Sequence, residues 1–297
     1  MQGTQEVERM QKAQEAQTVK QIQESAGMRK AQQLQSMQKV QQLRIAGLCC
    51  DLVLPGDYER GRIRYPVLYV NGEVPAQEIL AEVKRAGGRT DFILLCVRPD
   101  SWNDDFTPWP APAFRRDEEP PQGRAQTYLA RLAGEIKPYM DMHYRTKPEP
   151  EHTALAGYSL GGLTALYALY QTDSFGWIAS LSGSLWYDGF CEFMEKERPL
   201  RREVNVYLSL GKKERLSRNP RMGKVAECTE RARQILESQL GQVPAGEMKE
   251  EQADSRKGAD DRSRSGEVCL EWNEGGHFHE TAKRFARAIL WWEGRNL

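Results

Sequence analysis

The sequence has no excess of charge of either sign. Its 297 residues include 42 basic and 42 acidic side chains, so the formal net charge at pH 7 is zero. Proteins that bind nucleic acid or an anionic membrane surface usually carry a net basic charge or a dense basic patch. This balance therefore disfavours a polyanion as the partner, and we expect no nucleic-acid partner.

Long hydrophobic runs are also missing. No apolar run approaches the roughly 20 residues that a membrane helix needs, and the first residues lack the apolar core of a signal peptide. We expect no membrane partner and a cytoplasmic location.

Cysteine motifs are absent as well. The six cysteines are scattered along the chain and do not form the two C-x-x-C pairs that a zinc site of this type needs. In a cytoplasmic protein such scattered cysteines are typical of reduced, mostly buried thiols. Adjacent Cys49 and Cys50 must point to opposite faces if they lie on a strand. We expect neither a metal site nor an organic cofactor.

Two segments have too few apolar residues to form a core. Residues 1–44 are rich in Gln and contain neither proline nor an aromatic residue, and residues 241–266 are mostly charged or small. We expect the first to be a helical or mobile extension, with a partner-binding or self-associating arm as the alternative. The second is expected to be a disordered insertion. One domain, residues 45–297, remains.

Within that domain, patterns typical of strands alternate with patterns typical of helices. Strands are expected at residues 43–54, 65–70, 91–97, 152–156, 177–183, 204–210 and 268–272, and helices at 75–85, 126–139, 163–170, 225–240 and 280–293. This alternation predicts a doubly wound, mostly parallel sheet with helices on both faces. The long loop at residues 98–112 follows a strand, where α/β enzymes commonly build their sites.

A G-x-S-x-G pattern, Gly157-Tyr158-Ser159-Leu160-Gly161, lies between an expected strand and an expected helix. Glycines on both sides permit a crowded turn that leaves the serine hydroxyl exposed. At the start of the helix, free N–H groups and the helix dipole favour a developing negative charge. The pattern predicts that Ser159 is a nucleophile, and an ordinary glycine-rich turn is the alternative.

A serine nucleophile needs a base, and the chain has only four histidines. His143 and His152 precede the serine, and His152 lies at the wrong end of its strand. His277 and His279 follow the last strand, where the C-terminal loops of a parallel sheet gather. Because two glycines before His277 let the loop turn back, we assign His277 as the base, with His279 as the alternative.

The acid and the oxyanion donors are predicted from chain order. In this order, Ser…Asp/Glu…His, the acid follows a strand between the serine and the histidine. Glu214 fits; the alternatives are that it is a solvent-facing member of a charged run, or that Asp188 is the acid. The backbone N–H groups of Leu160 and Glu73 are the expected oxyanion donors, with the Glu73 side chain turned away.

Several separated motifs, in the right order, resemble the putative-esterase family of α/β hydrolases, the group of esterase D and enterochelin esterase. They are Tyr-Pro-Val-Leu-Tyr-Val-Asn-Gly (65–72), Phe-Thr-Pro-Trp-Pro (106–110), Gly-Tyr-Ser-Leu-Gly-Gly (157–162), Ser-Gly-Ser-Leu-Trp (182–186) and Gly-Gly-His (275–277). The resemblance covers roughly residues 45–240 and 267–297 and is closest to the siderophore-esterase-like branch. It implies an α/β-hydrolase fold with Ser159 and His277 catalytic. It suggests Glu214 as well, although some members work with a Ser–His pair.

The chain departs from this family in the loop that precedes the Thr-Pro motif. Siderophore esterases tend to place basic residues there, whereas residues 101–105 read Ser-Trp-Asn-Asp-Asp. Asp104 and Asp105 would repel a polyanionic substrate if they faced the pocket, with Arg98 offsetting part of the repulsion. In addition, Asn71 replaces the usual aspartate of the family.

These observations predict a carboxylic ester hydrolase. Ser159 attacks the acyl carbon, His277 transfers the proton, Glu214 orients His277, and water then hydrolyses the acyl-enzyme. One alternative is an acyltransferase or thioesterase with the same triad. Another is a non-catalytic interaction protein that uses its N-terminal arm.

The substrate is expected to be a small or medium ester, siderophore-like or another acyl ester. Trp109, Tyr158 and Trp186 are expected to form the wall of an acyl or aryl pocket, because they lie in or beside the motifs at the expected site. Structural packing is the alternative for each of these side chains. The oligomeric state is left open.

Overall fold

The computed structural model describes residues 38–241 and 265–296, so most of the expected N-terminal extension, residues 1–37, and nearly all of the expected insertion lie outside the described residues. The domain begins earlier than residue 45, because strand β1 starts at Val40. The single strand expected at residues 43–54 is a hairpin of β1 and β2. Ala46 and Gly47 turn the chain with positive φ values of 48° and 81°, as a two-residue hairpin turn requires.

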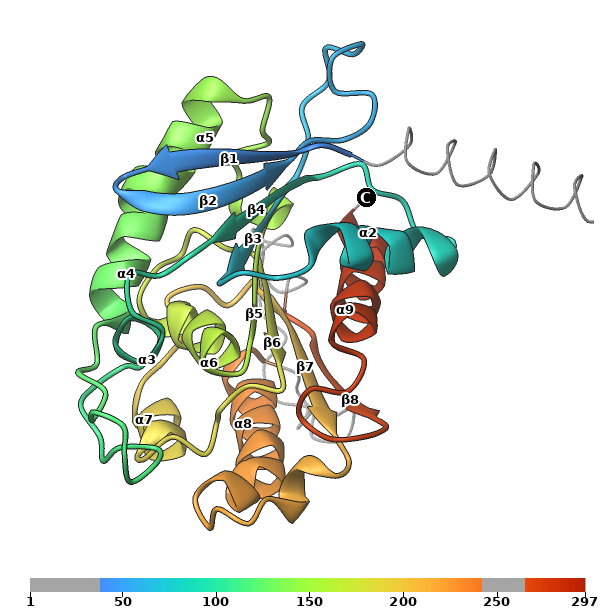
Figure 1. Ribbon diagram of the computed structural model, residues 1–297. Helices are drawn as coiled ribbons and strands as arrows, with labels where there is room; N and C mark the ends of the chain where they lie inside the picture. Colours follow the sequence, from blue (N-terminus) through green and yellow to red (C-terminus); the bar gives the residue numbers. More distant parts are fainter. Residues whose placement is uncertain (1–37, 242–264, 297) are drawn as a thin grey trace, which may run out of the picture. The chain divides into compact units, whose positions relative to one another are not determined.

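The described residues form one eight-stranded sheet with the order β1-β2-β4-β3-β5-β6-β7-β8 (Figure 1). The strands are β1 (Val40–Ile45), β2 (Leu48–Val53), β3 (Val67–Asn71), β4 (Ile93–Val97), β5 (Thr153–Tyr158), β6 (Trp177–Leu181), β7 (Asn205–Gly211) and β8 (Val268–Asn273). Strand β2 runs antiparallel to β1 and β4, and the other neighbours are parallel. The expected mostly parallel sheet is confirmed.

Helices cover both faces of this sheet (Figure 1). Helices α2 (Ala76–Arg85) and α9 (Thr281–Asn296) lie on one face, and α4 (Ala125–Arg131), α5 (Lys137–His143), α6 (Leu160–Tyr167), α7 (Phe190–Lys196) and α8 (Val225–Gln239) lie on the other. The helix expected at residues 126–139 is a longer unit, in which the π-helical turn Leu132–Ile136 joins α4 to α5. None of the helices among the described residues has the length and apolar character needed to cross a bilayer.

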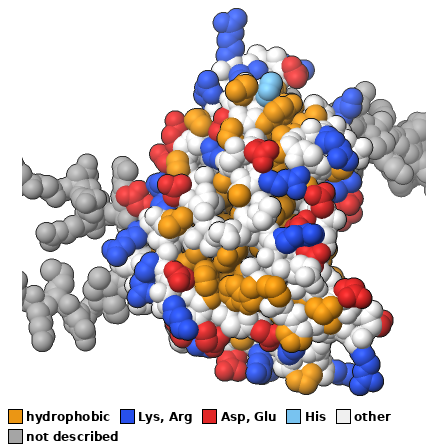
Figure 2. Space-filling model, turned by 90° about the vertical axis from the view of Figure 1, so that its left-hand side faces the viewer, with side chains coloured by type: hydrophobic (Ala, Val, Ile, Leu, Met, Phe, Trp, Pro, Cys, Tyr) orange, Lys and Arg blue, Asp and Glu red, His pale blue; other side chains and the backbone are white. Residues whose placement is uncertain are grey.

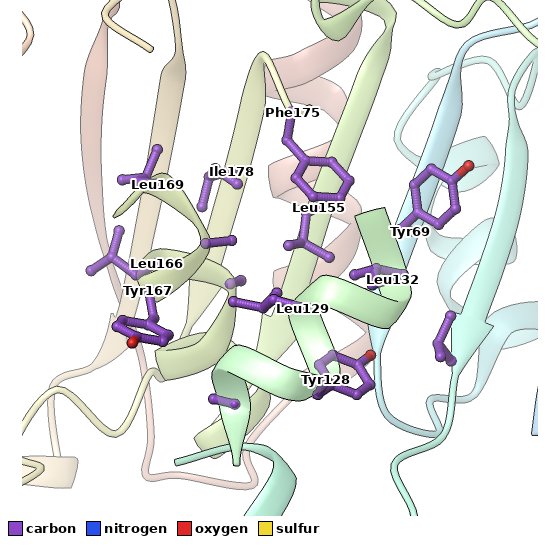
Figure 3. Close-up of a cluster of buried hydrophobic side chains, with 14 of the residues drawn as sticks. Tyr69, Tyr128, Leu129, Leu132, Leu155, Leu166, Tyr167, Leu169, Phe175 and Ile178 are labelled. Carbon is purple, nitrogen blue, oxygen red and sulfur yellow. The ribbon is translucent and has the colours of Figure 1, made fainter. Parts of the chain in front are cut away.

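The larger core cluster lies between the sheet and helices α4 and α6. Figure 3 shows Tyr69 and Leu155 from the strands facing Leu129 and Leu132 from the helical layer, and all of them are buried. Because the inner strands are covered on both faces, their residues are buried throughout their length. This burial explains why the sequence shows continuous apolar runs there rather than alternation.

The order of the strands contains a topological switch point. Strand β4 pairs with one side of β3, and β5 pairs with the other side, so the chain reverses its direction of winding between them. In open α/β sheets, ligands bind at such a reversal, outside the carboxyl ends of the strands. The segments after β3, β5, β6, β7 and β8 all meet at this edge.

The six cysteines, all within the described residues, are free thiols. Cys50, Cys96 and Cys191 are buried, Cys228 and Cys269 are half-buried, and Cys49 is exposed. Neighbouring Cys49 and Cys50 therefore point to opposite faces of β2, as the alternation of a strand requires.

Candidate active site

Ser159 lies in a sharp turn between β5 and α6. Its backbone has φ 57° and ψ −122°, a conformation that non-glycine residues rarely adopt. Three backbone hydrogen bonds hold it: its N–H donates to the Leu181 carbonyl (3.0 Å), and its carbonyl accepts from the N–H groups of Leu163 and Ser184 (3.0 Å each). A strained backbone that is held from several sides is typical of a functional residue.

The flanking glycines are required by close backbone contacts. A Cβ atom on Gly157 would collide with the Gly161 carbonyl, and a Cβ atom on Gly161 would lie 2.9 Å from the Asn71 carbonyl oxygen. The same Asn71 donates through Nδ2 to the Gly161 carbonyl (3.0 Å). The turn after β5 is therefore packed directly against the end of β3.

Ser159, His277 and Glu214 form a continuous chain of hydrogen bonds. His277 Nε2 lies 3.0 Å from Ser159 Oγ, and His277 Nδ1 lies 2.8 Å from Glu214 Oε2. A carboxylate can only accept, so Nδ1 carries the proton and Nε2 has a free lone pair for the serine hydroxyl. His279 is half-exposed and lies 3.9 Å from Glu280, so the structure brings His277, and not His279, to the serine.

Glu214 follows β7 and points inward. Its Oε1 accepts from the Gly211 N–H and from the Ser182 hydroxyl, each at 2.7 Å. Burial alone would raise the pKa of this carboxyl, but hydrogen bonds from His277, Ser182 and Gly211 outweigh burial and lower it. Glu214 is therefore ionised at neutral pH, whereas Asp188, the alternative acid, forms an ion pair with Arg221 at 2.5 Å.

Arg284 is a buried neighbour of the triad that the sequence did not reveal. It lies on α9 with 1% of its surface exposed. Its Nη1 donates to Glu214 Oε1 at 2.9 Å, and its Nη2 donates to the Gly276 carbonyl at 2.8 Å. The spacing along the helix was the available signal. Arg284 lies four residues before Ala288 and so on the same face of the helix, and an arginine on a buried face needs a partner of opposite charge.

Two of the expected pocket residues lie elsewhere. Tyr158 is buried on the α9 side of the sheet, where its hydroxyl bonds to the His277 carbonyl and its ring contacts that of His277 at 5.4 Å. Tyr158 is the last residue of β5, and its side chain packs in the core cluster on the face covered by α9. Trp109 packs against Phe193, with ring centroids 5.4 Å apart, and its indole N–H donates to the Asp188 carbonyl at 2.9 Å.

A cavity of about 370 Å³ opens onto the triad. Its apolar lining comes mainly from Trp102, Phe114, Trp186 and Phe278, so Trp186 is the expected wall residue that the structure places there. Polar groups also reach it; among them, Ser184 Oγ lies 3.4 Å from Ser159 Oγ. A cavity that combines aromatic and other apolar walls with convergent polar groups is typical of a small-molecule site.

Asp104 and Asp105 do not line this cavity, although their loop contributes Trp102 and Asn103 to it. Both carboxylates pair with Arg124, at 3.2 and 3.0 Å, and Asp105 also accepts from the Ser101 N–H at 2.9 Å. Both residues belong to the short helix α3 (Trp102–Asp105), where Asp105 is buried. The repulsion of an anionic substrate that their sequence position suggested is therefore largely neutralised.

The two expected oxyanion donors come from different segments of the chain, Leu160 from the start of α6 and Glu73 from the segment after β3. The Gly72 N–H already donates to the Val97 carbonyl at 2.7 Å, which makes the Glu73 N–H the next one in the turn after β3. The Glu73 side chain is 71% exposed, 3.8 Å from Arg98, and so points away. Leu160 begins α6 and lines the cavity. The role of these two amides stays a prediction.

Neither charge sign dominates the face shown in Figure 2. Basic and acidic side chains are interspersed there, and hydrophobic side chains gather in a patch in its lower half. This face therefore presents no continuous positive field for a polyanion. Among residues 38–241 and 265–296, no three His, Cys, Asp or Glu side chains are grouped as a metal site would need.

Comparisons with known proteins identify a family and a relative. A family model described as putative esterase matches residues 50–255. The uncharacterized protein YbbA of Bacillus subtilis (strain 168) is 25% identical over 252 residues, which cover 82% of this chain and 92% of that protein.

Solved structures share the fold. An IroE-like serine hydrolase from Shewanella oneidensis matches with a TM-score of 0.65 at 16% identity, over 84% of this chain and 78% of that one. Siderophore hydrolase EstA from Aspergillus nidulans matches with a TM-score of 0.57 at 17% identity, over 88% and 95%.

Proposed function

The chain belongs to the putative-esterase family of α/β hydrolases, and we propose that its carboxylic ester hydrolase activity uses Ser159 as the nucleophile. The observation that carries this proposal is the line of hydrogen bonds from Ser159 Oγ through His277 to Glu214 at the cavity. Serine, histidine and a carboxylate in this geometry are the parts that acyl transfer through an acyl-enzyme needs.

Acylation begins when Ser159 Oγ attacks the carbonyl carbon of the ester. His277 Nε2, 3.0 Å away, takes the hydroxyl proton, and the imidazolium that forms is stabilised by the ionised Glu214 at Nδ1. His277 then gives the proton to the leaving alkoxide oxygen, so the alcohol departs neutral.

The negative charge on the carbonyl oxygen needs donors at the same time. We assign the N–H groups of Leu160 and Glu73 to this role, supported by the position of Leu160 at the start of α6 and by the use of the Gly72 N–H in another bond. A water molecule then attacks the acyl carbon, His277 takes its proton, and the acid is released as Ser159 is restored.

The lining of the cavity favours an ester that carries an aromatic group. Trp102, Phe114 and Trp186 line the same cavity as Ser159, and the rings of Phe114 and Trp186 meet edge to face at 5.6 Å. Arg115 and Glu118 also line the cavity; Arg115 Nε lies 3.6 Å from Glu118 Oε1, so these two opposite charges partly offset each other. A ferulic acid esterase, named for an aromatic acid, is among the proteins with this fold, which agrees with such a substrate class.

Hydrolysis of p-nitrophenyl acetate and butyrate tests the proposal directly. We expect turnover by the wild type and its loss in Ser159→Ala. Ser174→Ala is a matched control, because Ser174 lies in the turn before β6, at the opposite end of the sheet. Equal rates in wild type and Ser159→Ala, or no turnover in either, would contradict the nucleophile assignment.

A comparison of methyl ferulate with methyl butyrate tests the aromatic preference. We expect a higher kcat/KM for the ferulate, with the preference reduced in Trp186→Ala. Equal values of kcat/KM for the two esters in the wild type would contradict the proposed substrate class while leaving the hydrolase assignment intact.

A further inference from the structure

We propose that Arg284 is a positioning residue for this reaction: it holds Glu214 and the His277 loop together and so sets the geometry of the triad before substrate binds. The inference rests on the roles proposed above for Ser159, His277 and Glu214. Among the contacts of the described residues, Arg284 does not touch Ser159 and does not itself line the cavity, so its effect has to pass through Glu214 and the His277 loop.

The first contact of Arg284 fixes the carboxylate. Nη1 donates to Glu214 Oε1 at 2.9 Å, the same oxygen that accepts from Ser182 and Gly211. The other oxygen, Oε2, is thereby left to accept from His277 Nδ1. Because each oxygen has its own donors, rotation of the carboxylate would break several hydrogen bonds at once.

The second contact of Arg284 fixes the loop that carries the base. Nη2 donates to the carbonyl of Gly276, the residue before His277, at 2.8 Å, and lies 3.4 Å from the Glu274 carbonyl. Between these carbonyls, Gly275 has φ 80°, where the chain turns back towards the serine. The planar fork of one guanidinium therefore connects the acid to the loop of the base, which a lysine ammonium does with less geometric specificity.

Tyr158 extends the same network to His277 itself. Its hydroxyl accepts from Arg284 Nη1 at 3.1 Å and donates to the carbonyl of His277. The ring of Phe285, the residue after Arg284 on α9, packs 6.1 Å from the Tyr158 ring. Residues on β5 and α9 thus fix the position of His277 relative to the serine, although His277 lies on the loop after β8.

The charge of Arg284 also acts on Glu214. Arg284 and Glu214 are buried together, with 1% and 4% of their side chains exposed. A buried arginine needs a counter-charge, and a buried carboxylate needs donors to stay ionised. Without Arg284, we expect the pKa of the Glu214 carboxyl to rise. As the pH is lowered, Glu214 would then become protonated at a higher pH than in wild type and would no longer stabilise the protonated His277.

The test compares Arg284→Met, Arg284→Lys and the control Arg287→Met in hydrolysis of p-nitrophenyl butyrate. Arg287 lies one turn further along α9 and pairs with Glu271 at 3.1 Å, outside the triad network. For Arg284→Met we expect kcat to fall on the order of 10²-fold with KM within about threefold of wild type, because misplacement near 1 Å has costs of that size. Arg284→Lys should recover part of kcat, and the control should retain it.

Two further results follow for Arg284→Met if the inference is right. The acid limb of its kcat/KM profile moves to higher pH, and the downfield proton resonance of His277 Nδ1 weakens or disappears in NMR spectra. A residue that only stabilises the fold would lower the melting temperature and leave both unchanged in the folded protein. Wild-type kcat, pH profile and resonance in folded Arg284→Met would overturn the inference.

The NMR resonance separates this inference from the proposed function, because it needs no turnover. If the wild type hydrolyses no ester but shows the His277 resonance, and Arg284→Met lacks that resonance, the positioning role stands and the hydrolase proposal falls. If Arg284→Met does not fold, Tyr158→Phe takes its place, since it removes the bond to the His277 carbonyl and leaves the buried ion pair. Unchanged kcat and resonance in Tyr158→Phe and in Arg284→Lys would then overturn the inference.

Discussion

Replacement of Glu214 by glutamine is expected to inactivate the enzyme through the tautomer of His277. Oε1 of Glu214 accepts from Arg284, Ser182 and the Gly211 N–H, all within 2.9 Å. In Glu214→Gln the side-chain oxygen must occupy this position, because the amide NH₂ cannot face so many donors. The NH₂ group then points at His277 Nδ1, which has to accept, so the proton of the imidazole moves to Nε2 and faces Ser159.

The size of the effect follows from that geometry. A histidine that is protonated at Nε2 has no lone pair for the serine hydroxyl, and the corresponding change in serine proteases lowers kcat about 10⁴-fold. A loss between 10³- and 10⁴-fold corresponds to about 4 to 5.5 kcal/mol of transition-state stabilisation. The same change removes the counter-charge of Arg284, and breaking a buried pair destabilises a fold by about 3 to 5 kcal/mol.

Steady-state kinetics with p-nitrophenyl butyrate, combined with urea unfolding, separates the two effects. We expect kcat to fall by at least 10³-fold while KM stays within a few-fold of wild type. The urea unfolding curve of Glu214→Gln shows whether the variant is folded under the conditions of the kinetic assay. Glu214→Asp is the matched control, because it keeps the charge and shortens the reach. A folded Glu214→Gln with kcat within tenfold of wild type would refute this reasoning and favour a Ser159–His277 pair that works without an acid.

Three other changes test separate parts of the structure. Gly157→Ala should abolish folding or lower the melting temperature strongly in thermal scans, because its Cβ atom would collide with the Gly161 carbonyl; a melting temperature equal to wild type would contradict this. The pKa of Glu214 is lowered in the folded state, so its contribution to the free energy of unfolding is fully present above the unfolded-state pKa and is lost as pH falls through the folded one; urea unfolding between pH 7 and pH 3 should therefore show a larger loss of stability in wild type than in Glu214→Gln, and equal losses would contradict this. Trp186→Ala should raise KM for aromatic esters, whereas Trp109→Ala should mainly destabilise the fold, by about 3 kcal/mol or more; equal effects of the two on KM would argue that both line the cavity.

The sequence predicted the three residues of the candidate triad from their position in the chain. Ser159, Glu214 and His277 each follow the end of a parallel strand, and such ends meet at one edge of the sheet. The strands themselves were visible because full burial gives continuous apolar runs, as in Ile93–Val97. Both signals are local, so they need no knowledge of which residues touch across the fold.

The features that the sequence missed depend on facing and on distant partners. The hairpin turn at residues 46–47 has no signature, because Ala46 adopts a positive φ that alanine rarely shows. Tyr158 and Trp109 were assigned to the pocket wall because they lie in or beside the motifs. The face of the sheet to which Tyr158 points is set by strand register, and the position of Trp109 is set by its packing against Phe193. Arg284 finds its partner Glu214 seventy residues earlier in the chain, and nothing in its own neighbourhood identifies that partner.

Arg284 also stabilises a loop at the edge of the sheet, the loop that carries His277. His277 follows β8, the last strand of the sheet, most of whose residues are only partly buried, whereas Ser159 follows the fully buried β5. A base on an edge element moves more freely than a nucleophile at the centre, yet the proton transfer between them requires a fixed distance. The bonds of Arg284 and Tyr158 to the carbonyls of Gly276 and His277 connect the edge loop to β5 and α9. The precision of the triad therefore comes from the buried polar network behind it as much as from the strands that carry its members.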